Sequence, residues 1–485
     1  MNAPVSRGQL TSRGGEAEPA VEQALYEARQ KIYPRAVSGW FATWRWSLVF
    51  FTQAVFYGGA WLRWNGRQAV LFDLAHRKFY IFGLVLWPQD IVYLTALLVI
   101  SALALFLFTA VAGRLFCGYA CPQTVYTEIF SWIERRIEGD RVARMKLDAG
   151  PLTLRKFTLK SVKQTAWIAL AAWTGFTFVG YFTPIHTLFH EVGTLSLGGW
   201  ETFWILFYGF ATYGNAGYMR EQVCKYMCPY ARFQSAMFDR DTLVISYDRE
   251  RGEPRGSRGR KVDPRARGLG DCVDCGLCVQ VCPTGIDIRN GLQYECIGCA
   301  ACIDACSRIM SSMNYPPGLI RYSTENALLR HWPQGRIWRR VLRPRTLIYA
   351  ALLVAVAAAA GVSLALRTPL KVDVIRDRAA LAREADDGAV ENVYRLQIMN
   401  TAETPRRFRI DVAGLDGIAL TSPGLVDGRV EVAPAAARTV AVRVSVPAGH
   451  GRPGPNKITF DVQADDDPAV AVHEKSVFLL PRSAP

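Results

Sequence analysis

The chain has 485 residues, of which 50% are hydrophobic and 12% aromatic, and its formal net charge is +15. Such an apolar, tryptophan-rich composition indicates contact with a membrane. All twelve cysteines lie between Cys117 and Cys306, which excludes a small secreted disulfide scaffold, because cysteines run throughout such chains. The first forty residues are polar, carry both charge signs and show no signal-peptide pattern.

Five stretches are long and apolar enough to cross a bilayer, which needs about 20 helical residues. The predicted spans are Arg45–Leu62, Ile91–Gly113, Val162–Phe182, Trp200–Tyr218 and Thr346–Leu366. Tryptophans such as Trp61 and Trp87 near their ends are typical of the membrane interface. The piece Phe79–Trp87 is too short to span and precedes Pro88, so it is predicted to be an interfacial or re-entrant segment.

The orientation follows from the distribution of lysine and arginine. Arg114–Leu159 contains eight of them and Arg220–Arg345 contains twenty-one, whereas Thr183–Gly199 contains none. Because positive residues stay on the cytoplasmic side, the N-terminus and residues 219–345 are predicted to be cytoplasmic and the tail after Leu366 exported. The charge is therefore explained without nucleic acid. The arginine-rich run 249–267 also lacks the interleaved aromatic residues of an RNA site.

The tail alternates apolar and polar residues in short runs such as Val393–Met399 and Val440–Val446, which is typical of a small β-sandwich. The predicted architecture thus combines an α-helical transmembrane bundle, a ferredoxin-like α+β domain and an all-β immunoglobulin-like sandwich. Its parts are a cytoplasmic segment at 1–43, a four-span membrane domain at 44–240, a basic linker at 241–268, a ferredoxin-type domain at 269–345, a fifth transmembrane helix at 346–366, a stem at 367–389 and a periplasmic sandwich at 390–485.

Eight cysteines form two runs of the type C-x2-C-x2-C-x3-C. The first run is followed by Pro283, and the second by Ser307 in its place. In two-cluster ferredoxins the fourth cysteine of each run ligates the other 4Fe–4S cluster. One cluster is therefore predicted on Cys272, Cys275, Cys278 and Cys306, and the other on Cys282, Cys296, Cys299 and Cys302. A pair of structural zinc sites is the alternative, but the doubled rhythm favours iron–sulfur clusters.

Two further signatures match each other: Cys117-Gly-Tyr-Ala-Cys121-Pro and Cys224-Lys-Tyr-Met-Cys228-Pro. Each follows a span at its predicted cytoplasmic end, so all four thiols are expected to converge at the membrane surface. A C-x3-C pair puts two thiols about one turn apart, on one face if the local chain is helical. Three interpretations stay open: a redox dithiol pair, a soft-metal site for an ion such as Cu(I), and a packing role.

His186 and His190 are four residues apart in a predicted exported connection, beside Glu191. On a helix they could form a metal-binding pair. An ordinary interfacial pair is the favoured alternative.

Paired membrane C-x3-C-P motifs, a two-cluster ferredoxin, a late span and an exported sandwich together resemble the CcoG/FixG/RdxA family of cytochrome oxidase accessory proteins. The resemblance runs from about Tyr33 to the end of the chain. The polyferredoxins NapH and NosR are more distant relatives that lack this sandwich. The resemblance implies a bacterial inner-membrane protein that assists assembly of cbb3-type cytochrome c oxidase by reducing Cu(II) to Cu(I). Cys117, Cys121, Cys224 and Cys228 would then be the copper or terminal redox residues.

The implied cofactors are two 4Fe–4S clusters, with copper as a further metal. The implied partners are membrane lipid, oxidase subunits or copper chaperones and transporters, and an unidentified electron donor; a homodimer is left open. Met227 could add a soft thioether ligand for copper. Two other functions compete with copper reduction: a general quinol-linked electron conduit to a partner reductase, and a non-redox assembly scaffold that works through the sandwich.

Overall fold

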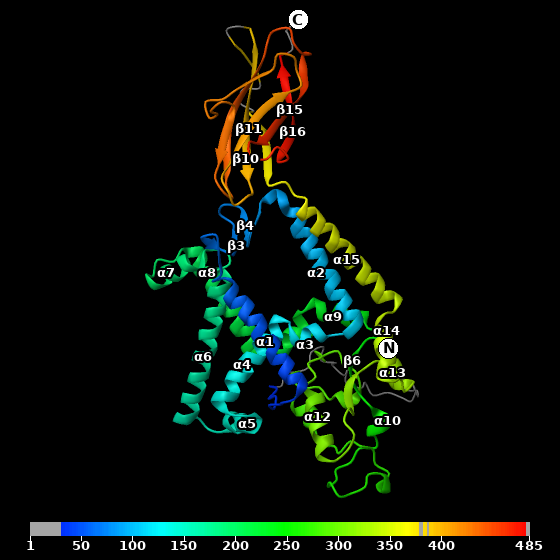
Figure 1. Ribbon diagram of the computed structural model, residues 1–485. Helices are drawn as coiled ribbons and strands as arrows, with labels where there is room; N and C mark the ends of the chain where they lie inside the picture. Colours follow the sequence, from blue (N-terminus) through cyan, green and yellow to red (C-terminus); the bar gives the residue numbers. More distant parts are fainter. Residues whose placement is uncertain (1–30, 378–381, 386–387, 482–485) are drawn as a thin grey trace, which may run out of the picture.

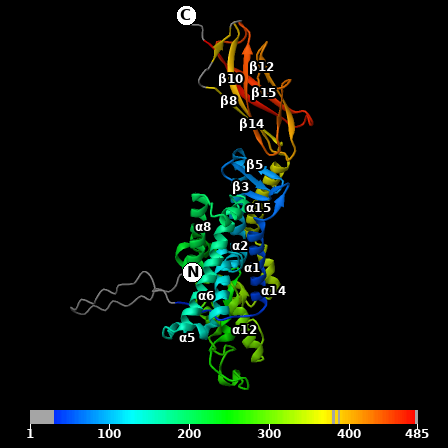
Figure 2. The ribbon, with the colours of Figure 1, turned by 90° about the vertical axis from the view of Figure 1, so that its left-hand side faces the viewer.

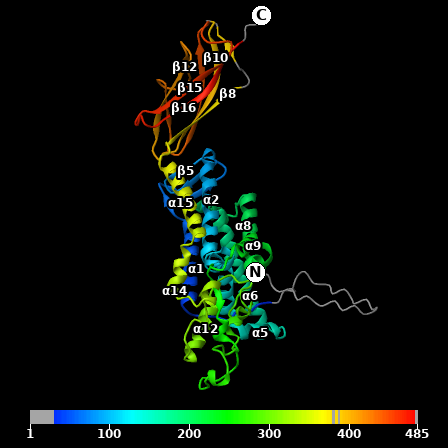
Figure 3. The same cartoon turned by 90° about the vertical axis from the view of Figure 1, so that its right-hand side faces the viewer.

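The computed structural model describes residues 31–377, 382–385 and 388–481. The described chain is elongated, with three parts in a row (Figure 1). A cysteine-rich module lies at one end, helices form the middle, and a β-sandwich stands at the other end. Two views at right angles to the first keep this order (Figures 2 and 3). Residues 1–30 of the predicted segment 1–43 lie outside the described residues.

Each of the five predicted spans is helical. The corresponding helices are α1 (Trp40–Gly59), α2 (Ile91–Ala112), α6 (Leu154–Val179), α8 (Gly199–Thr212) and α15 (Pro344–Ala365). α8 is continued by a π-helical segment, η2 (Tyr213–Met219). η2 contains Gly214 and Gly217, which lower the cost of leaving regular α-helical geometry.

Two helical segments of the described chain have the length and apolar composition to cross a membrane, Pro88–Ala112 and Pro344–Ala365. The first includes a short 3-10 turn, η1 (Pro88–Asp90). α6 falls short because its first turns carry charged residues, including Lys160 and Lys163, and α8 has only 14 residues. The five-span count therefore stays a prediction.

α2 and α15 lie side by side along the middle of the molecule (Figure 1). The Tyr93 hydroxyl donates to the carbonyl of Ser363 at 3.2 Å. Apolar side chains on both helices, such as Leu98 and Val354, are exposed. Keeping such a surface in water costs about 25 cal/mol per Å² of apolar area, a cost that lipid removes. This helix pair is consistent with a membrane protein.

Shorter helices connect or flank the long ones. In the described chain they are α3 (Leu115–Tyr119), α4 (Pro122–Glu138), α5 (Arg141–Ala149), α7 (Ile185–Gly193), η3 (Val223–Met227), α9 (Pro229–Met237), α10 (Arg249–Gly252), η4 (Arg265–Arg267), α11 (Leu277–Gln280), η5 (Ile288–Asn290), α12 (Ala301–Ser312), α13 (Glu325–Leu329) and α14 (Gln334–Val341). Glycine ends α4, because Gly139 has a φ of 89°, which side chains rarely tolerate.

The segment Phe79–Trp87 differs from the prediction of an interfacial or re-entrant piece. It forms a β-hairpin, β4 (Lys78–Ile81) and β5 (Leu84–Leu86), in a sheet with β3 (Val70–Asp73). A smaller hairpin, β1 (Arg63–Trp64) and β2 (Arg67–Gln68), turns at Asn65-Gly66, where both residues have positive φ. Val85 and Trp87 are buried with Met399 of the sandwich, and this burial explains the apolar character of the segment.

The β-sandwich consists of two antiparallel sheets. One sheet has the order β12-β14-β10-β8 with β9 beside β10, and the other has the order β13-β11-β15-β16. The strands are β8 (Leu370–Arg376), β9 (Arg383–Glu384), β10 (Val390–Asn400), β11 (Arg406–Ala413), β12 (Ala419–Thr421), β13 (Arg429–Val432), β14 (Ala437–Val446), β15 (Gly454–Ala464) and β16 (Ala471–Leu480). Alternate residues such as Tyr394, Leu396 and Ile398 are fully buried between the sheets.

The predicted stem at 367–389 requires a correction. β8 pairs with β10 in antiparallel register, so the sandwich begins at Leu370 rather than at residue 390. Lys371, Asp373 and Arg376 give the strand the mixed-charge composition of a stem, although Leu370 and Val372 are fully buried. The sandwich is also bound to the helical part, since Asp90 pairs with Arg367 and Lys371 at its base.

The predicted linker at 241–268 is also partly structured. β6 (Val244–Tyr247) pairs with β7 (Ile320–Ser323), which lies beyond both cysteine runs. Arg251 pairs with Asp271 at 2.6 Å. The cysteine-rich module is therefore closed by a strand from each side, and we refer to residues 244–323 as the ferredoxin module. Its core includes Ile245, Ile303 and Met310.

Candidate metal centres

Four cysteines of the ferredoxin module line one cavity: Cys272, Cys275, Cys278 and Cys306. The first three come from the first run, around the short helix α11. Cys306 comes from the second run, on α12. The structure therefore brings the last cysteine of one run to the first three of the other.

The second cavity lies next to the first and is lined by the reciprocal set: Cys282, Cys296, Cys299 and Cys302, with Cys278 also at its wall. Its remaining wall is apolar and includes Ile245, Ile286 and Ile288. Each quartet is thus assembled from both runs and enclosed by the core of the module.

The backbone of the two runs repeats. Asp274 and Gly276 have positive φ in the first run, and Gly298 and Ala300 have positive φ at the equivalent positions of the second. Left-handed residues separated by one position curl the chain into a concave turn whose N–H groups point inward. Such a turn suits a bound group that is anionic overall.

Burial dominates the electrostatics of these thiols. It raises the pKa of Cys278 to about 11, although Arg289 nearby lowers it, and it raises the pKa of Cys296 and of Cys306 to about 12. A buried thiolate needs a cation in place of its proton. Soft thiolate donors suit iron–sulfur clusters and zinc alike.

The way the cysteines are grouped bears on which of these metals they hold. Among the described residues, no group of three or more His, Cys, Asp or Glu side chains is arranged to hold a single metal ion. A zinc ion needs four ligands at about 2.0–2.3 Å. In a 4Fe–4S cluster each cysteine binds a different iron, so the sulfurs stand further apart. The two reciprocal quartets, each assembled from both runs, are the arrangement of a two-cluster ferredoxin, so the residues present fit 4Fe–4S clusters.

The two C-x3-C-P motifs have the same local structure. The first cysteine of each lies in a short helix, Cys117 in α3 and Cys224 in η3. The second cysteine, Cys121 or Cys228, is the extended N-cap residue of the next helix, α4 or α9, whose first residue is the proline. Proline favours this position because its missing N–H would have no partner there. The two thiols of a pair therefore do not share one continuous helical face, as the sequence suggested they could.

The backbone repeat extends upstream of the cysteines. Gly113 has φ 55° and ψ −115°, and Arg220, at the same distance before its cysteine, has φ 43° and ψ −111°. This conformation is rare for a residue with a side chain. A buried charge cluster supports Arg220, whose guanidinium donates to Glu134 at 3.0 Å while Arg144 donates to the same carboxylate at 3.0 Å.

The structure brings the four C-x3-C-P thiols together. Burial, together with the charges of Cys121 and Cys228, raises the pKa of Cys117 to about 11. Burial likewise raises the pKa of Cys224 to about 12, with contributions from the other three cysteines. We call these four residues the membrane-side quartet. Their convergence joins two motifs that are about a hundred residues apart in sequence.

The membrane-side quartet lies against the ferredoxin module. A methyl group placed on Gly118 would lie 2.8 Å from the carbonyl carbon of Gly298 and 2.9 Å from Cα of Cys299. Cys117 and Cys224 pack against the same buried cluster as Cys299. The turn that carries Cys117 is therefore in backbone contact with a turn that carries a ferredoxin cysteine.

Two buried arginines span this contact. Arg114 donates to the carbonyl of Ala231 at 2.6 Å and to that of Tyr294 in the ferredoxin module. Arg45 donates to the carbonyl of Cys299 at 3.2 Å. Sequence reasoning missed both, although a charged residue at the end of an apolar stretch is a recognisable signal for such a role.

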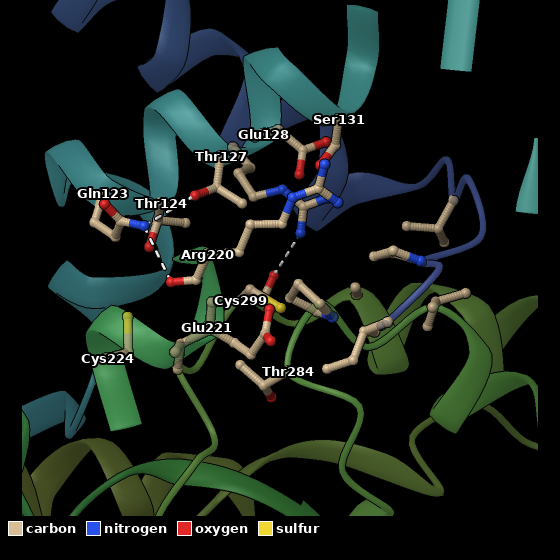
Figure 4. A pocket seen from close by; sticks show the side chains of 18 of the residues that line it. Gln123, Thr124, Thr127, Glu128, Ser131, Arg220, Glu221, Cys224, Thr284 and Cys299 are labelled. Carbon is tan, nitrogen blue, oxygen red and sulfur yellow. Dashed lines mark hydrogen bonds between the residues drawn. The ribbon is translucent and has the colours of Figure 1, made fainter. Parts of the chain in front are cut away.

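Cys224 and Cys299 both line one cavity (Figure 4). Figure 4 shows Arg220, Glu221 and Cys299 at its centre and Cys224 to one side. Glu128 lies above them and pairs with Arg135 at 3.2 Å. Apolar residues from the segment after residue 31, such as Ile32 and Val37, close one wall. Nothing in the sequence pattern indicated this cavity.

The other candidate residues lie apart from these centres. His186 and His190 are exposed on α7, and the ring of His186 contacts Trp61 edge to face at 5.3 Å. Among the described residues no third His, Cys, Asp or Glu is grouped with them to hold a metal ion, and their role stays a prediction. Met227 is exposed.

Family models match three parts of the chain. A 4Fe–4S binding domain matches residues 94–139, and a 4Fe–4S dicluster domain matches residues 219–325. A model described as an IG-like fold at the C-terminal of FixG, putative oxidoreductase, matches residues 360–481. The predictions of an iron–sulfur protein and of an immunoglobulin-like C-terminal domain are confirmed.

Three curated proteins match along most of their length. Protein RdxA of Cereibacter sphaeroides is 39% identical and covers 88% of this chain and 92% of its own. Protein RdxB of the same organism is 38% identical and covers 94% of this chain and 97% of its own. Nitrogen fixation protein FixG of Rhizobium meliloti is 36% identical and covers 94% of this chain and 93% of its own.

Among solved structures, a FixG-related protein from Vibrio parahaemolyticus matches 23% of this chain and 95% of its own at 22% identity, with a TM-score of 0.21. The curated relatives match over nearly the whole chain, and one of the matching family models is named for FixG. The chain therefore belongs to the FixG and RdxA family of iron–sulfur proteins.

Proposed function

We propose that the chain is an electron-transfer protein of the bacterial inner membrane that reduces Cu(II) to Cu(I) during assembly of a cbb3-type cytochrome c oxidase. The ferredoxin module would face the cytoplasm and the sandwich the periplasm. Placement on opposite sides of the membrane is supported by the apolar pair α2 and α15, which runs between the two (Figure 1), and the direction is supported by the lysine and arginine residues of the ferredoxin side. Oxidase subunits and copper chaperones or transporters would be the partners on either side.

The two ferredoxin quartets would ligate two 4Fe–4S clusters, with Cys272, Cys275, Cys278 and Cys306 in one and Cys282, Cys296, Cys299 and Cys302 in the other. Bound there, each cluster supplies one-electron chemistry. The chain excludes water from both cavities with apolar side chains, including Ile245 and Met310. Arg289 and Arg45 supply positive charge beside Cys278 and Cys299.

The observation that carries the proposal is the contact between Gly118 and Cys299. It supports a short electron path from the second ferredoxin quartet to Cys117, Cys121, Cys224 and Cys228 as the terminal redox residues. Each Cu(II) takes up one electron and becomes Cu(I), and no atom is transferred. An external electron donor then replaces the electron that the protein has lost.

The cavity between Cys224 and Cys299 supports copper as the electron acceptor. Cu(II) is bound by nitrogen and oxygen donors, whereas Cu(I) prefers sulfur. The cavity contains carboxylates, Glu128 and Glu221, together with the thiol of Cys224. A site that offers oxygen to the oxidised ion and sulfur to the reduced ion favours reduction.

A Cu(II) reduction assay tests the proposal. Full-length protein is reduced with dithionite under anaerobic conditions and separated from excess reductant before Cu(II) and a Cu(I)-specific dye are added. We expect Cys117→Ser and Cys228→Ser to lower the rate at least tenfold while the paramagnetic signals of both ferredoxin clusters persist. Equal rates in these variants and the wild type would refute the role of the thiols.

A quinol-linked electron conduit is the second candidate, favoured by the apolar wall of the same cavity, which includes Ile32 and Ile297 beside Arg220. Such a pocket also suits a quinone ring with polar carbonyl groups. This function predicts that a quinol analogue reduces the ferredoxin clusters in purified protein and that Cu(II) does not reoxidise them.

A further inference from the structure

A run of arginines lies between the ferredoxin module and the apolar helix α15. Residues 330–345 contain six arginines, and no aspartate or glutamate occurs between Glu325 and Asp373. Most of this run forms α14, and only Leu342 and Arg343 separate α14 from α15. Figure 1 shows α14 at the end of α15 that is nearer the ferredoxin module. The arginines are therefore concentrated at the edge of the apolar surface of α15.

Three guanidinium groups surround one indole ring in this run. Arg336 lies 4.7 Å from the ring centroid of Trp332, Arg340 lies 5.6 Å from it and Arg330 lies 5.7 Å from it. With Arg339 these residues line an open hollow on the surface, and we call the five residues the arginine hollow. Each cation is attracted to the ring, but the cations repel one another at such short range.

The protein supplies few counterions to the arginine hollow. Arg340 pairs with Asp241 at 3.5 Å. Within the described chain, no ion pair joins the other three arginines of the hollow to a carboxylate, and all three are exposed. A bound anion would lower the repulsion between the guanidinium groups. Phosphate suits them best, because a guanidinium fork donates two parallel hydrogen bonds to its oxygens.

The other side of α14 is apolar. Trp338 and Leu342 lie about one helical turn apart, and their side chains are 67% and 69% exposed. Trp338 is two positions after Arg336, which places it about 200° around the helix. Exposed apolar side chains continue into α15 at Leu347 and Ile348. An amphipathic segment of this kind lies in the membrane interface, with its apolar side among the acyl chains and its cations at the headgroups.

From these observations we propose that the arginine hollow binds the phosphate of an acidic phospholipid headgroup. A lipid fits better than a soluble anion, because the apolar side of the same helix contacts acyl chains. Basic clusters beside a transmembrane helix are typical of acidic-lipid recognition. The bound lipid would hold the connection between the ferredoxin module and α15 at the membrane surface. The inference rests on the membrane placement in the proposed function and is independent of copper reduction.

Native mass spectrometry of the full-length protein in a neutral detergent tests the inference. The protein is titrated with phosphatidylglycerol, with phosphatidylcholine and with inorganic phosphate at constant ionic strength. We expect phosphatidylglycerol to bind about tenfold more tightly than phosphatidylcholine, whose headgroup carries a compensating cation. Equal affinities for the two lipids would overturn the proposal. Displacement of the lipid by an equal concentration of inorganic phosphate would also overturn it, because the hollow would then bind a free anion.

A double substitution locates the site. Arg336→Gln with Arg339→Gln should weaken phosphatidylglycerol binding about thirtyfold, since each arginine near an acidic headgroup contributes about a factor of five. Arg265→Gln with Arg267→Gln is the matched control, because it removes the same charge from exposed positions elsewhere in the ferredoxin module. The control should bind the lipid like the wild type. An equal loss of affinity in both double variants would mean diffuse attraction to the net charge and would contradict a defined site.

Trp332→Leu tests the arrangement of the arginines rather than their number. This variant keeps every charge but removes the ring that positions three guanidinium groups, so the affinity should fall about fivefold. Melting curves in lipid-free detergent check that each variant is folded. Wild-type affinity in both Trp332→Leu and the arginine variant would refute the proposal. None of these measurements uses copper, so lipid binding at α14 without Cu(II) reduction would refute only the proposed function.

Discussion

The ferredoxin module and the membrane-side quartet both gather cysteines from repeated motifs, but by different means. In the module, both runs lie between Cys272 and Cys306, and left-handed turns such as those at Gly276 and Ala300 wrap the chain around each cavity. In the quartet, the two pairs are far apart in sequence, and only the second cysteine of each pair sits at the start of a longer helix. The first arrangement depends on local backbone geometry, and the second depends on tertiary packing.

The two regions are also held in place by different contacts. The module has its own apolar core, including Ile245, Ile303 and Met310. The quartet is held by the buried charges around Glu134 on one side and by the ferredoxin module on the other. We therefore expect the quartet to be the more easily disrupted of the two regions, and substitutions in its supports test this difference.

Glu134→Gln should have the largest effect. The side chain is 2% exposed and pairs with Arg144 and Arg220, so the variant leaves two buried arginines without a counterion. The expected loss is about 3–5 kcal/mol in the free energy of unfolding. Thermal melting in detergent measures it. Glu431→Gln, at an exposed pair with Arg407, is the control and should cost less than about 1 kcal/mol.

The stability lost in Glu134→Gln should depend on pH. Burial would raise the pKa of Glu134, but Arg220, Arg144 and Lys163 outweigh it and hold the pKa below its usual value of 4.5. The contribution of the carboxylate is thus fully present above that usual value and is lost as the pH falls through the lowered pKa. The melting difference between wild type and Glu134→Gln should shrink in acid. A difference that grew would contradict the charge network.

Gly118→Ala tests the contact between the two regions. The added methyl group would meet Gly298 and Cys299 at under 3 Å, and both are backbone contacts that cannot move independently. We expect a loss of about 1–3 kcal/mol in stability and slower Cu(II) reduction with an unchanged iron content. Gly214→Ala is the matched control, because its methyl group would meet nothing within 4 Å. Equal rates in the two variants would show that electrons do not cross here.

Asp304→Ala should have the smallest effect. From α12 in the ferredoxin module, its carboxylate accepts hydrogen bonds from the backbone N–H groups of Phe41 at 3.3 Å and Ala42 at 2.8 Å, at the start of α1. Loss of a helix cap costs about 1 kcal/mol. Hydrogen exchange should show faster exchange in the first turn of α1 only. Faster exchange throughout the ferredoxin module would mean that Asp304 supports the module itself.

Local patterns in the sequence predict which parts the molecule contains. The spacing of the eight cysteines between Cys272 and Cys306 predicts two runs of cluster ligands. Local turns are enough to bring together cysteines that are separated by two residues. Alternation in runs such as Val393–Met399 predicts the sandwich, because side chains on a strand alternate between its two faces. Apolar length predicts α2 and α15 to within a few residues.

The contacts between these parts depend on tertiary packing and were seen only in the structure. β6 has only four residues and β8 carries Lys371, Asp373 and Arg376 among its apolar residues, so both were predicted as linker and stem until their partners β7 and β10 were seen. The contact of Gly118 with Cys299 and the cap from Asp304 join residues far apart in sequence, and no local pattern encodes them. The four C-x3-C-P thiols are visible in the sequence, but their gathering into one quartet results from packing.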